Sequence, residues 1–171
     1  MSRLPATPRR HGRSAGILLH RRREGGTEVL LVHPGGPFWA KRDHGAWSIP
    51  KGEYGAEEDA LAAARREFEE ELGVPPPDGP ALELGEVRQK GGKLVRAWAL
   101  EGDLDPTAIV SNTCPVEWPP RSGRWIEVPE VDRAQWFSLD QARERINPAQ
   151  AALLDRLDAG AGTERGPAGK P

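Results

Sequence analysis

Nine residues in the middle of the chain, Arg65 to Gly73, read RREFEEELG and hold four glutamates and two arginines. The sequence predicts a helix over residues 57–72, because five strong helix formers run from Ala60 to Ala64. Gly73 and the three prolines that follow Val74 should end this helix. The fold must therefore bury one face of a strongly acidic helix.

On a helical wheel, three of these glutamates fall within one arc of about 100°: Glu67, Glu70 and Glu71. They lie beside an apolar stripe that must face the core, made of Leu61, Phe68 and Leu72. Glu69 points away from both groups and is expected to be plain surface. The carboxylates therefore border the buried side of the helix.

Like charges one turn apart repel each other by a few tenths of a kcal/mol per pair. Neither Arg65 nor Arg66 lies within the glutamate arc, so a different cation is needed to offset the repulsion. Mg²⁺ or Mn²⁺ fits, because hard divalent cations prefer oxygen ligands. From the helix alone, a solvated acidic face is an equally good interpretation.

The length of 171 residues predicts one domain, and a net charge of -2 argues against a dedicated nucleic-acid or membrane binder. The only cysteine, Cys114, excludes an intramolecular disulfide and suits a reducing cytoplasm. The sequence has no apolar run of about 18 residues and no apolar leader at its start. We expect a cytoplasmic protein with a small-molecule partner, and a homodimer is compatible with the sequence.

Domain limits follow from the ends of the chain. Residues 1–13 are basic and residues 159–171 are rich in Gly, Ala and Pro, so both are expected to be disordered tails around a domain at 14–158. Apolar runs and turn residues predict strands at 14–22, 27–34, 46–50, 81–89, 93–100 and 133–139, a loop at 113–123, and helices at 140–146 and 147–160 with N-caps Asp140 and Asn147. This order predicts an α/β fold, a three-layer α/β/α sandwich on a mixed sheet.

The flanks of the acidic helix complete a longer motif. From Gly52 to Val74 the chain matches the pattern G-x5-E-x7-R-E-U-x-E-E-x-G-U, where U is bulky and apolar. Every specified position agrees: Gly52, Glu58, Arg66, Glu67, Phe68, Glu70, Glu71, Gly73 and Val74. The segment resembles the Nudix box, the loop-helix-loop signature of Nudix hydrolases, and the resemblance extends coarsely over residues 14–158.

The resemblance implies hydrolysis of a diphosphate linkage in a nucleoside diphosphate joined to another group, with Mg²⁺ or Mn²⁺ as cofactor. Glu67, Glu70 and Glu71 resemble the metal-binding glutamates, and the Gly52 carbonyl could complete the metal shell. Arg66 and Glu58 resemble supporting residues that orient these carboxylates.

Further site residues are expected outside the box. An additional base or metal ligand is sought in a later loop, with Glu117 favoured over Glu127 and Glu130. Lys51 lies next to Gly52 at the mouth of the site and is expected to contact phosphate. The other candidate phosphate ligands, each equally explained as a solubilising charge, are Lys41, Arg42, Arg121 and Arg124.

The segment GAWSIPKGE, residues 45–53, resembles the W-x-x-P-K-G lead-in of Nudix enzymes that act on diadenosine polyphosphates, capped RNA ends and some nucleoside or inositol polyphosphates. The only tyrosine, Tyr54, lies inside the box, so the downstream tyrosine that stacks adenine in several of these enzymes is missing. Three tryptophans are alternative stacking platforms: Trp98, Trp118 and Trp125. Segments within residues 117–157 also resemble a bacterial group of predicted nucleoside triphosphate pyrophosphohydrolases.

Two function classes stay open. The first is an active hydrolase of a nucleoside or dinucleoside polyphosphate, with ADP-ribose-like or diphosphoinositol substrates as variants. The second is a Nudix domain that senses a nucleotide without cleaving it, although such domains typically lose box glutamates and none is missing here. The sequence names neither the substrate nor the bond that is cut.

Overall fold

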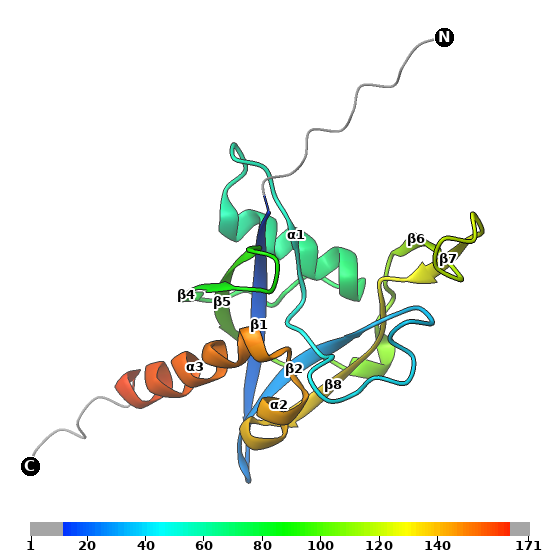
Figure 1. Ribbon diagram of the computed structural model, residues 1–171. Coiled ribbons are helices and arrows are strands. Elements are labelled where there is room, and N and C mark those ends of the chain that lie inside the picture. Colours follow the sequence, from blue (N-terminus) through cyan, green and yellow to red (C-terminus); the bar gives the residue numbers. More distant parts are fainter. Residues whose placement is uncertain (1–11, 165–171) are drawn as a thin grey trace, which may run out of the picture.

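The acidic helix packs against a mixed sheet in the computed structural model, which describes residues 12–164 (Figure 1). The strands are β1 (Arg13–Arg23), β2 (Gly26–Pro34), β3 (Lys51–Glu53), β4 (Leu82–Arg88), β5 (Leu94–Glu101), β6 (Thr113–Glu117), β7 (Trp125–Pro129) and β8 (Val131–Ser138). The helices are α1 (Ala60–Leu72), α2 (Leu139–Arg145) and α3 (Ala151–Glu164), with short 3₁₀ turns at Pro106–Ala108 and Pro148–Gln150.

The main sheet has the strand order β4-β5-β1-β2-β8, and β3 pairs with the start of β1. β1 runs parallel to β5 and antiparallel to both β2 and β3, so the sheet is mixed. β6 and β7 form a separate antiparallel hairpin that projects from the body of the molecule (Figure 1).

Alternate side chains of β1 enter two separate cores, as expected for a strand with both faces covered. Ile17 and Leu19 are buried with Phe68 of α1 on one face. Leu18 is buried on the other face with side chains of α2 and α3, among them Leu153. The predicted α/β/α sandwich is therefore confirmed.

The ends of α1 are fixed by its own neighbours. The Asp59 carboxylate accepts a hydrogen bond from the Ala62 N–H at 2.9 Å, so the helix begins at Ala60 rather than at residue 57. Gly73 ends it in the left-handed conformation, with φ of 77°. A Cβ on Gly73 would lie 2.6 Å from the Val110 carbonyl oxygen, so only glycine fits this cap.

Two predicted elements were wrong. Residues 46–50 form isolated bridges instead of a strand, because the Gln150 side chain accepts the Ile49 N–H at 3.0 Å in place of a neighbouring strand. Residues 113–123 are not a simple loop, since 113–117 form β6. Pro115 in this strand is tolerated because a two-stranded ribbon leaves each strand with an unpaired edge.

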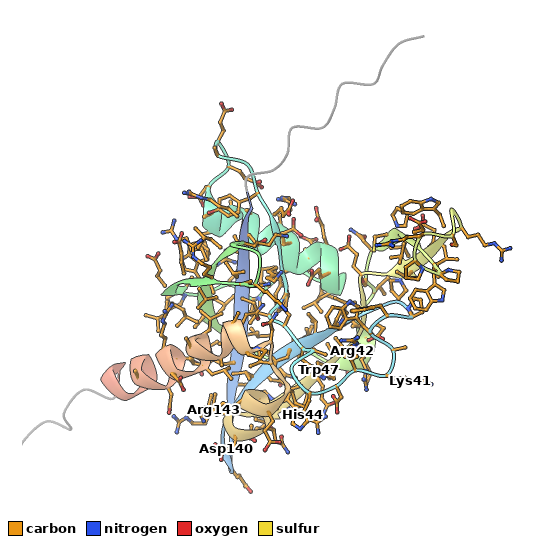
Figure 2. All side chains as sticks on the ribbon, in the orientation of Figure 1. Lys41, Arg42, His44, Trp47, Asp140 and Arg143 are labelled. Carbon is orange, nitrogen blue, oxygen red and sulfur yellow. The ribbon has the colours of Figure 1, made fainter. Side chains whose placement is uncertain are left out.

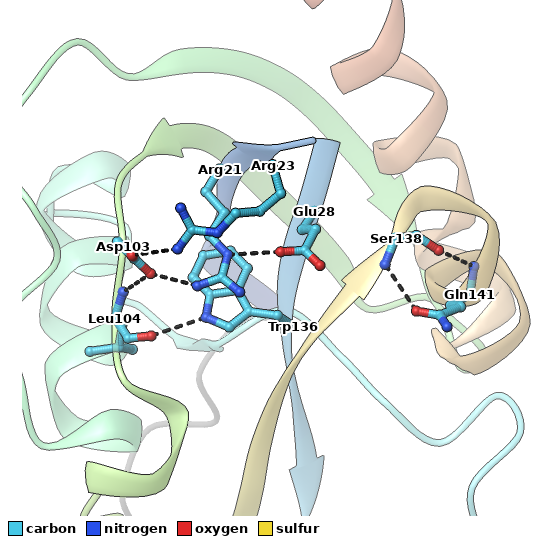
Figure 3. A network of polar contacts seen from close by, with 8 residues as sticks. All are labelled: Arg21, Arg23, Glu28, Asp103, Leu104, Trp136, Ser138 and Gln141. Carbon is cyan, nitrogen blue, oxygen red and sulfur yellow. Dashed lines mark hydrogen bonds and ion pairs between the residues drawn. The ribbon is translucent and has the colours of Figure 1, made fainter. Parts of the chain in front are cut away.

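The carboxyl-terminal helices also depart from expectation. Ser138, not Asp140, caps α2, through a capping box in which the Ser138 Oγ accepts the Gln141 N–H at 3.2 Å (Figure 3). Asn147 caps the 3₁₀ turn that precedes α3, as predicted for the start of this segment. α3 continues to Glu164, beyond its expected end at Gly160 and beyond the expected domain limit at Asp158. The remaining residues of the expected tails, 1–11 and 165–171, lie outside the described part of the chain.

A polar network joins the end of β1, the start of β2 and the segment that follows β5. Arg21 donates to Glu28 at 2.9 Å and to Asp103 at 2.7 Å, and its guanidinium lies 4.0 Å from the ring centre of Trp136 (Figure 3). The Trp136 indole N–H donates to the Leu104 carbonyl at 3.0 Å. These contacts hold the β1–β2 turn against the segment after β5.

Among the described residues, no helix is long and apolar enough to cross a membrane.

Candidate active site

A cavity of about 620 Å³ opens between α1 and the β6–β7 hairpin. Its acidic wall comes from residues 51–71 and presents Lys51, Gly52, Glu53, Arg66, Glu67, Glu70 and Glu71. The opposite wall comes from three separate segments and presents Pro34, Gly35, Gly36, Pro37, Phe38 and Trp39, then Cys114 and Val116, then Val128, Pro129 and Glu130. Five carboxylates thus face two basic side chains, so an anionic ligand needs an additional cation here.

Arg66 ties three carboxylates of the motif together. Its Nε and Nη2 donate to the two Glu58 carboxylate oxygens at 2.9 and 3.2 Å, the predicted supporting pair. Its Nη1 donates to Glu67 at 2.8 Å and to Glu70 at 3.2 Å. Although Arg66 was expected to lie outside the glutamate arc, its long side chain reaches the carboxylates of Glu67 and Glu70 and offsets part of their repulsion.

Gly52 and Glu67 are in direct contact. A Cβ on Gly52 would lie 2.0 Å from both the Cδ and the Oε2 of Glu67, so any larger residue would displace this carboxylate. Glu67 is buried, and burial raises its pKa, opposed by the hydrogen bond from Arg66. The absence of a side chain at residue 52 therefore leaves the space that the Glu67 carboxylate occupies.

The carboxyl group of Glu71 is buried. Burial raises the pKa of its carboxyl to about 8, against the lowering effect of the nearby Lys51. Its Oε2 is buried and has no hydrogen-bond partner. Burial also lowers the pKa of Lys51, whose charge Glu71 partly supports. A buried carboxylate oxygen without a partner is costly, so a cation bound at this atom would remove an energetic penalty.

The donor set fits a hard divalent cation. Carboxylate oxygens and a backbone carbonyl are the ligands that Mg²⁺ and Mn²⁺ prefer, and the acidic wall supplies both kinds. Within residues 12–164, however, no three carboxylate, imidazole or thiol groups already converge on one metal position. Arg66 donates hydrogen bonds to oxygens of Glu67 and Glu70 instead, so these side chains would have to turn away from Arg66 to bind a shared cation.

The later carboxylate in the cavity is Glu130, not the favoured Glu117. Burial first, and the charge of Glu70 second, raise the Glu130 pKa. Glu117 is outside the cavity lining and accepts the Gly123 N–H at 2.9 Å within the β6–β7 hairpin. Sequence reasoning ranked Glu130 lower because nothing in its local sequence shows that β7 ends at the cavity.

The more distant phosphate ligands are not gathered at the acidic wall. Lys41 and Arg42 lie on the exposed loop between β2 and β3 (Figure 2), and the Arg42 guanidinium stands 4.2 Å from the ring centre of Phe38. Arg121 lies in the turn of the β6–β7 hairpin, with φ of 61°, and is exposed, as is Arg124. Of the basic candidates, only Lys51 lines the cavity.

The predicted aromatic platforms also lie elsewhere. Trp98 is buried in the core beneath α1, as is Tyr54. Trp118 and Trp125 belong to the β6–β7 hairpin, outside the cavity lining. The aromatic side chains that do line the cavity are Phe38 and Trp39, which sequence reasoning missed because they lie in a Gly/Pro-rich loop without periodic pattern.

A family model described as the NUDIX domain matches residues 10–157. Comparison with the curated proteins gives no match. Among solved structures, the chain is similar to the Ap4A hydrolase of C. elegans in a binary complex, with a TM-score of 0.63 and 21% identity over 88% of this chain and 98% of that one.

Two further structures share this fold. The Nudix hydrolase RenU of M. smegmatis has a TM-score of 0.55 and 26% identity, covering 90% of this chain and 87% of that one. The NUDIX domain of NrtR from Shewanella oneidensis, solved with ADP ribose, has a TM-score of 0.60 and 16% identity, covering 87% of each chain. With the family model spanning nearly the whole described chain and the motif at the cavity complete, this protein belongs to the Nudix hydrolases, a family of pyrophosphohydrolases.

Proposed function

We propose that this chain is a metal-dependent hydrolase that cleaves a diphosphate linkage in a nucleoside or dinucleoside polyphosphate. The observation that carries the proposal is the buried Glu71 Oε2 without a partner, in a wall of carboxylates at the edge of a large cavity. A polyanionic substrate and a hard cation together would complement this wall.

Glu67, Glu70 and Glu71, with the carbonyl of Gly52, are the proposed holders of Mg²⁺ or Mn²⁺. When bound, such a cation neutralises diphosphate charge and lowers the pKa of a bound water. Arg66, held by its two hydrogen bonds to the Glu58 carboxylate, would orient the other carboxylates. Lys51, which lines the same wall, is the proposed contact for a phosphate oxygen.

Glu130 is the proposed second source of a base or ligand, in place of Glu117. It lines the cavity on the wall opposite α1, and the burial that raises its pKa makes its carboxylate a stronger base. The hairpin residues Trp118 and Arg121, with Lys41 and Arg42, would contact only parts of a substrate that extend beyond the cavity.

The substrate is proposed as a class. The similar structures include an Ap4A hydrolase and a NUDIX domain solved with ADP ribose, so dinucleoside polyphosphates and ADP-ribose-like diphosphates are both candidates. Diphosphoinositol compounds are a further variant. A single free cysteine, Cys114, suits work in the cytoplasm.

The test is turnover by the purified protein with Mg²⁺. The panel contains diadenosine tetraphosphate, nucleoside triphosphates, ADP-ribose, NADH and a diphosphoinositol phosphate. We expect hydrolysis of at least one nucleotide, lost with EDTA and restored by Mn²⁺. Nucleotide binding without turnover of any member would instead identify a sensor domain.

A further inference from the structure

The cavity wall opposite the glutamates contains an exposed aromatic pair. Phe38 keeps 49% of its surface exposed, although it is a large apolar side chain. Its ring meets the Trp39 ring edge-on, with centroids 5.0 Å apart and planes at 85°. Trp39 itself packs partly against the core beneath α2 and α3, so the pair is anchored on one side and open on the other.

The loop that carries this pair, residues 34–45, is held at both ends. The Gly35 N–H donates to the Glu130 carbonyl at 3.1 Å, and a Cβ on Gly35 would lie 2.0 Å from the Pro129 carbonyl oxygen. Near the other end, the buried His33 ring contacts the Arg42 carbonyl at 2.6 Å. Such anchoring presents the aromatic pair to a ligand at low entropic cost.

Arg42 completes the arrangement. Its guanidinium lies 4.2 Å from the Phe38 ring centre and 5.8 Å from that of Trp39. A cation at this distance is attracted to the face of the ring and holds its orientation. One face of Phe38 is thus supported by Arg42, while the ring still contributes to the cavity lining.

The chemistry of this wall selects for a flat apolar group. None of the described cavity-lining residues carries an amide, hydroxyl or imidazole side chain. Around the aromatic pair, the lining is proline, glycine and valine, with the Cys114 thiol and the Glu130 carboxylate as the polar side chains of this wall. Side-chain hydrogen bonds of the kind that distinguish one base edge from another are therefore scarce, whereas a ring face is available.

We propose that Phe38, supported by Trp39 and Arg42, is the stacking platform for the nucleobase of the substrate, and that the enzyme consequently tolerates either purine. This inference rests on the proposed nucleoside polyphosphate substrate. The diphosphate lies against the acidic wall and the base against Phe38 across the same cavity. Stacking of a base on an aromatic side chain is largely independent of base identity.

The test is calorimetric binding, in Mg²⁺, of the α,β-methylene analogues of ADP and GDP, with methylenediphosphonate as the probe without a base. The variants are Phe38→Leu, which keeps an apolar side chain but loses the ring, and Phe38→Tyr, which keeps the ring. Trp125→Ala is the matched control, because Trp125 is also exposed, at 64%, but lies outside the cavity lining.

We expect Phe38→Leu to weaken both nucleotide analogues by roughly 5- to 150-fold, the range expected for loss of one stacked base. Methylenediphosphonate affinity should stay within about twofold, Phe38→Tyr should retain nucleotide affinity, and the two purines should bind wild type within about threefold of each other. Unchanged nucleotide binding in Phe38→Leu, an equal loss for methylenediphosphonate, or a larger purine preference would overturn the proposal.

Turnover separates this inference from the proposed function. If wild type hydrolyses a nucleotide and Phe38→Leu binds the analogues with normal affinity, the proposed hydrolase activity is supported and the stacking role of Phe38 is refuted. If the analogues bind to wild type through Phe38 but no member of the panel is hydrolysed, the stacking role of Phe38 is supported and the proposed hydrolase activity is refuted. Failure of wild type to bind either analogue contradicts the platform directly.

Discussion

The two walls of the cavity are built in different ways. The acidic wall comes from one continuous stretch, residues 51–71, in which β3 leads through a turn into α1. The opposite wall comes from segments around residues 34–39, 114–116 and 128–130, which meet only after the sheet and the β6–β7 hairpin have formed. The carboxylates, whose spacing matters for the chemistry, are thus mostly supplied by one helix. The shape of the ligand site depends instead on tertiary contacts between distant segments.

This difference predicts different consequences of mutation. Changes on the acidic wall should mainly affect the chemical step and the cation. Changes on the opposite wall should mainly affect substrate affinity. The following variants test that division, from the largest expected effect to the smallest.

Glu67→Gln should lower kcat/KM for the best substrate by at least ~100-fold, because a neutral amide can neither neutralise a cation nor accept a proton. Glu69→Gln is its matched control, since Glu69 lies two positions along the same helix but is exposed. Steady-state kinetics of both variants should separate them. Equal losses in the two variants, or none, would contradict the assignment of the carboxylate arc.

Glu71 should make the metal-free protein less stable as pH rises. Its folded pKa is about 8 against an ordinary 4.5, so the folded state keeps a proton that the unfolded state releases. This stabilising contribution is complete below about pH 4.5 and is lost as pH rises through about 8. In EDTA, the free energy of unfolding in urea should fall by a few kcal/mol, on the order of the full shift, between about pH 5 and 8.

Glu71→Gln should reduce that slope and make the metal-free protein more stable than wild type near pH 8. A smaller slope of the same sign should remain, because burial also raises the pKa values of Glu67 and Glu130. Parallel urea titrations of the two proteins in EDTA give the comparison. A variant with the wild-type slope would show that Glu71 is not the buried acid.

Gly52→Ala should destabilise the fold by about 1–3 kcal/mol, because the new methyl group would overlap the Glu67 carboxylate. Activity should fall with it, since Glu67 must move. Gly55→Ala is the control, because a Cβ there meets nothing within 4 Å. Thermal unfolding measures both variants, and similar midpoints would refute the proposed contact between Gly52 and Glu67.

His33→Gln tests the anchor of the opposite wall. His33 is fully buried, and its two ring nitrogens contact Asp132 Oδ1 at 2.8 Å and the Arg42 carbonyl at 2.6 Å. Both partners are acceptors, so both contacts are hydrogen bonds only when both ring nitrogens carry protons. The loss of one of these two hydrogen bonds in His33→Gln should lower the free energy of unfolding by about 1–3 kcal/mol.

The kinetic signature of His33→Gln should be a raised KM with kcat nearly unchanged, because the loop that carries Phe38 loses one support. His44→Gln is the control, since His44 is exposed on the same loop and contacts the Glu144 carbonyl (Figure 2). A fall in kcat with unchanged KM would place His33 with the acidic wall instead.

Much of the acidic wall could be predicted from sequence because helical periodicity and a glycine cap are local properties. The spacing of Glu67, Glu70 and Glu71 placed them on one face, and Phe68 beneath them is fully buried as expected. Local geometry could not reveal how far the Arg66 side chain reaches. A helical wheel gives only the direction of each Cβ. The position of the Arg66 guanidinium also depends on the four torsion angles of its side chain.

The opposite wall could not be predicted in the same way. Glu130 was ranked behind Glu117 because sequence distance from the motif says nothing about which end of a hairpin faces a cavity. Phe38 and Trp39 were missed because their position depends on Gly35 approaching the Pro129 backbone, a contact between residues 94 positions apart. The strand expected at 46–50 lies instead at residues 51–53, where it pairs with β1, while the Ile49 N–H donates to the distant Gln150 side chain.

The central claim, that the carboxylates of α1 hold a divalent cation, is tested most directly by calorimetric titration of Mn²⁺ into metal-free protein. Wild type and Glu69→Gln should bind with similar affinity, and Glu71→Gln should bind at least ~10-fold more weakly, because the buried oxygen without a partner is lost as a ligand. Wild-type affinity in Glu71→Gln would contradict the account.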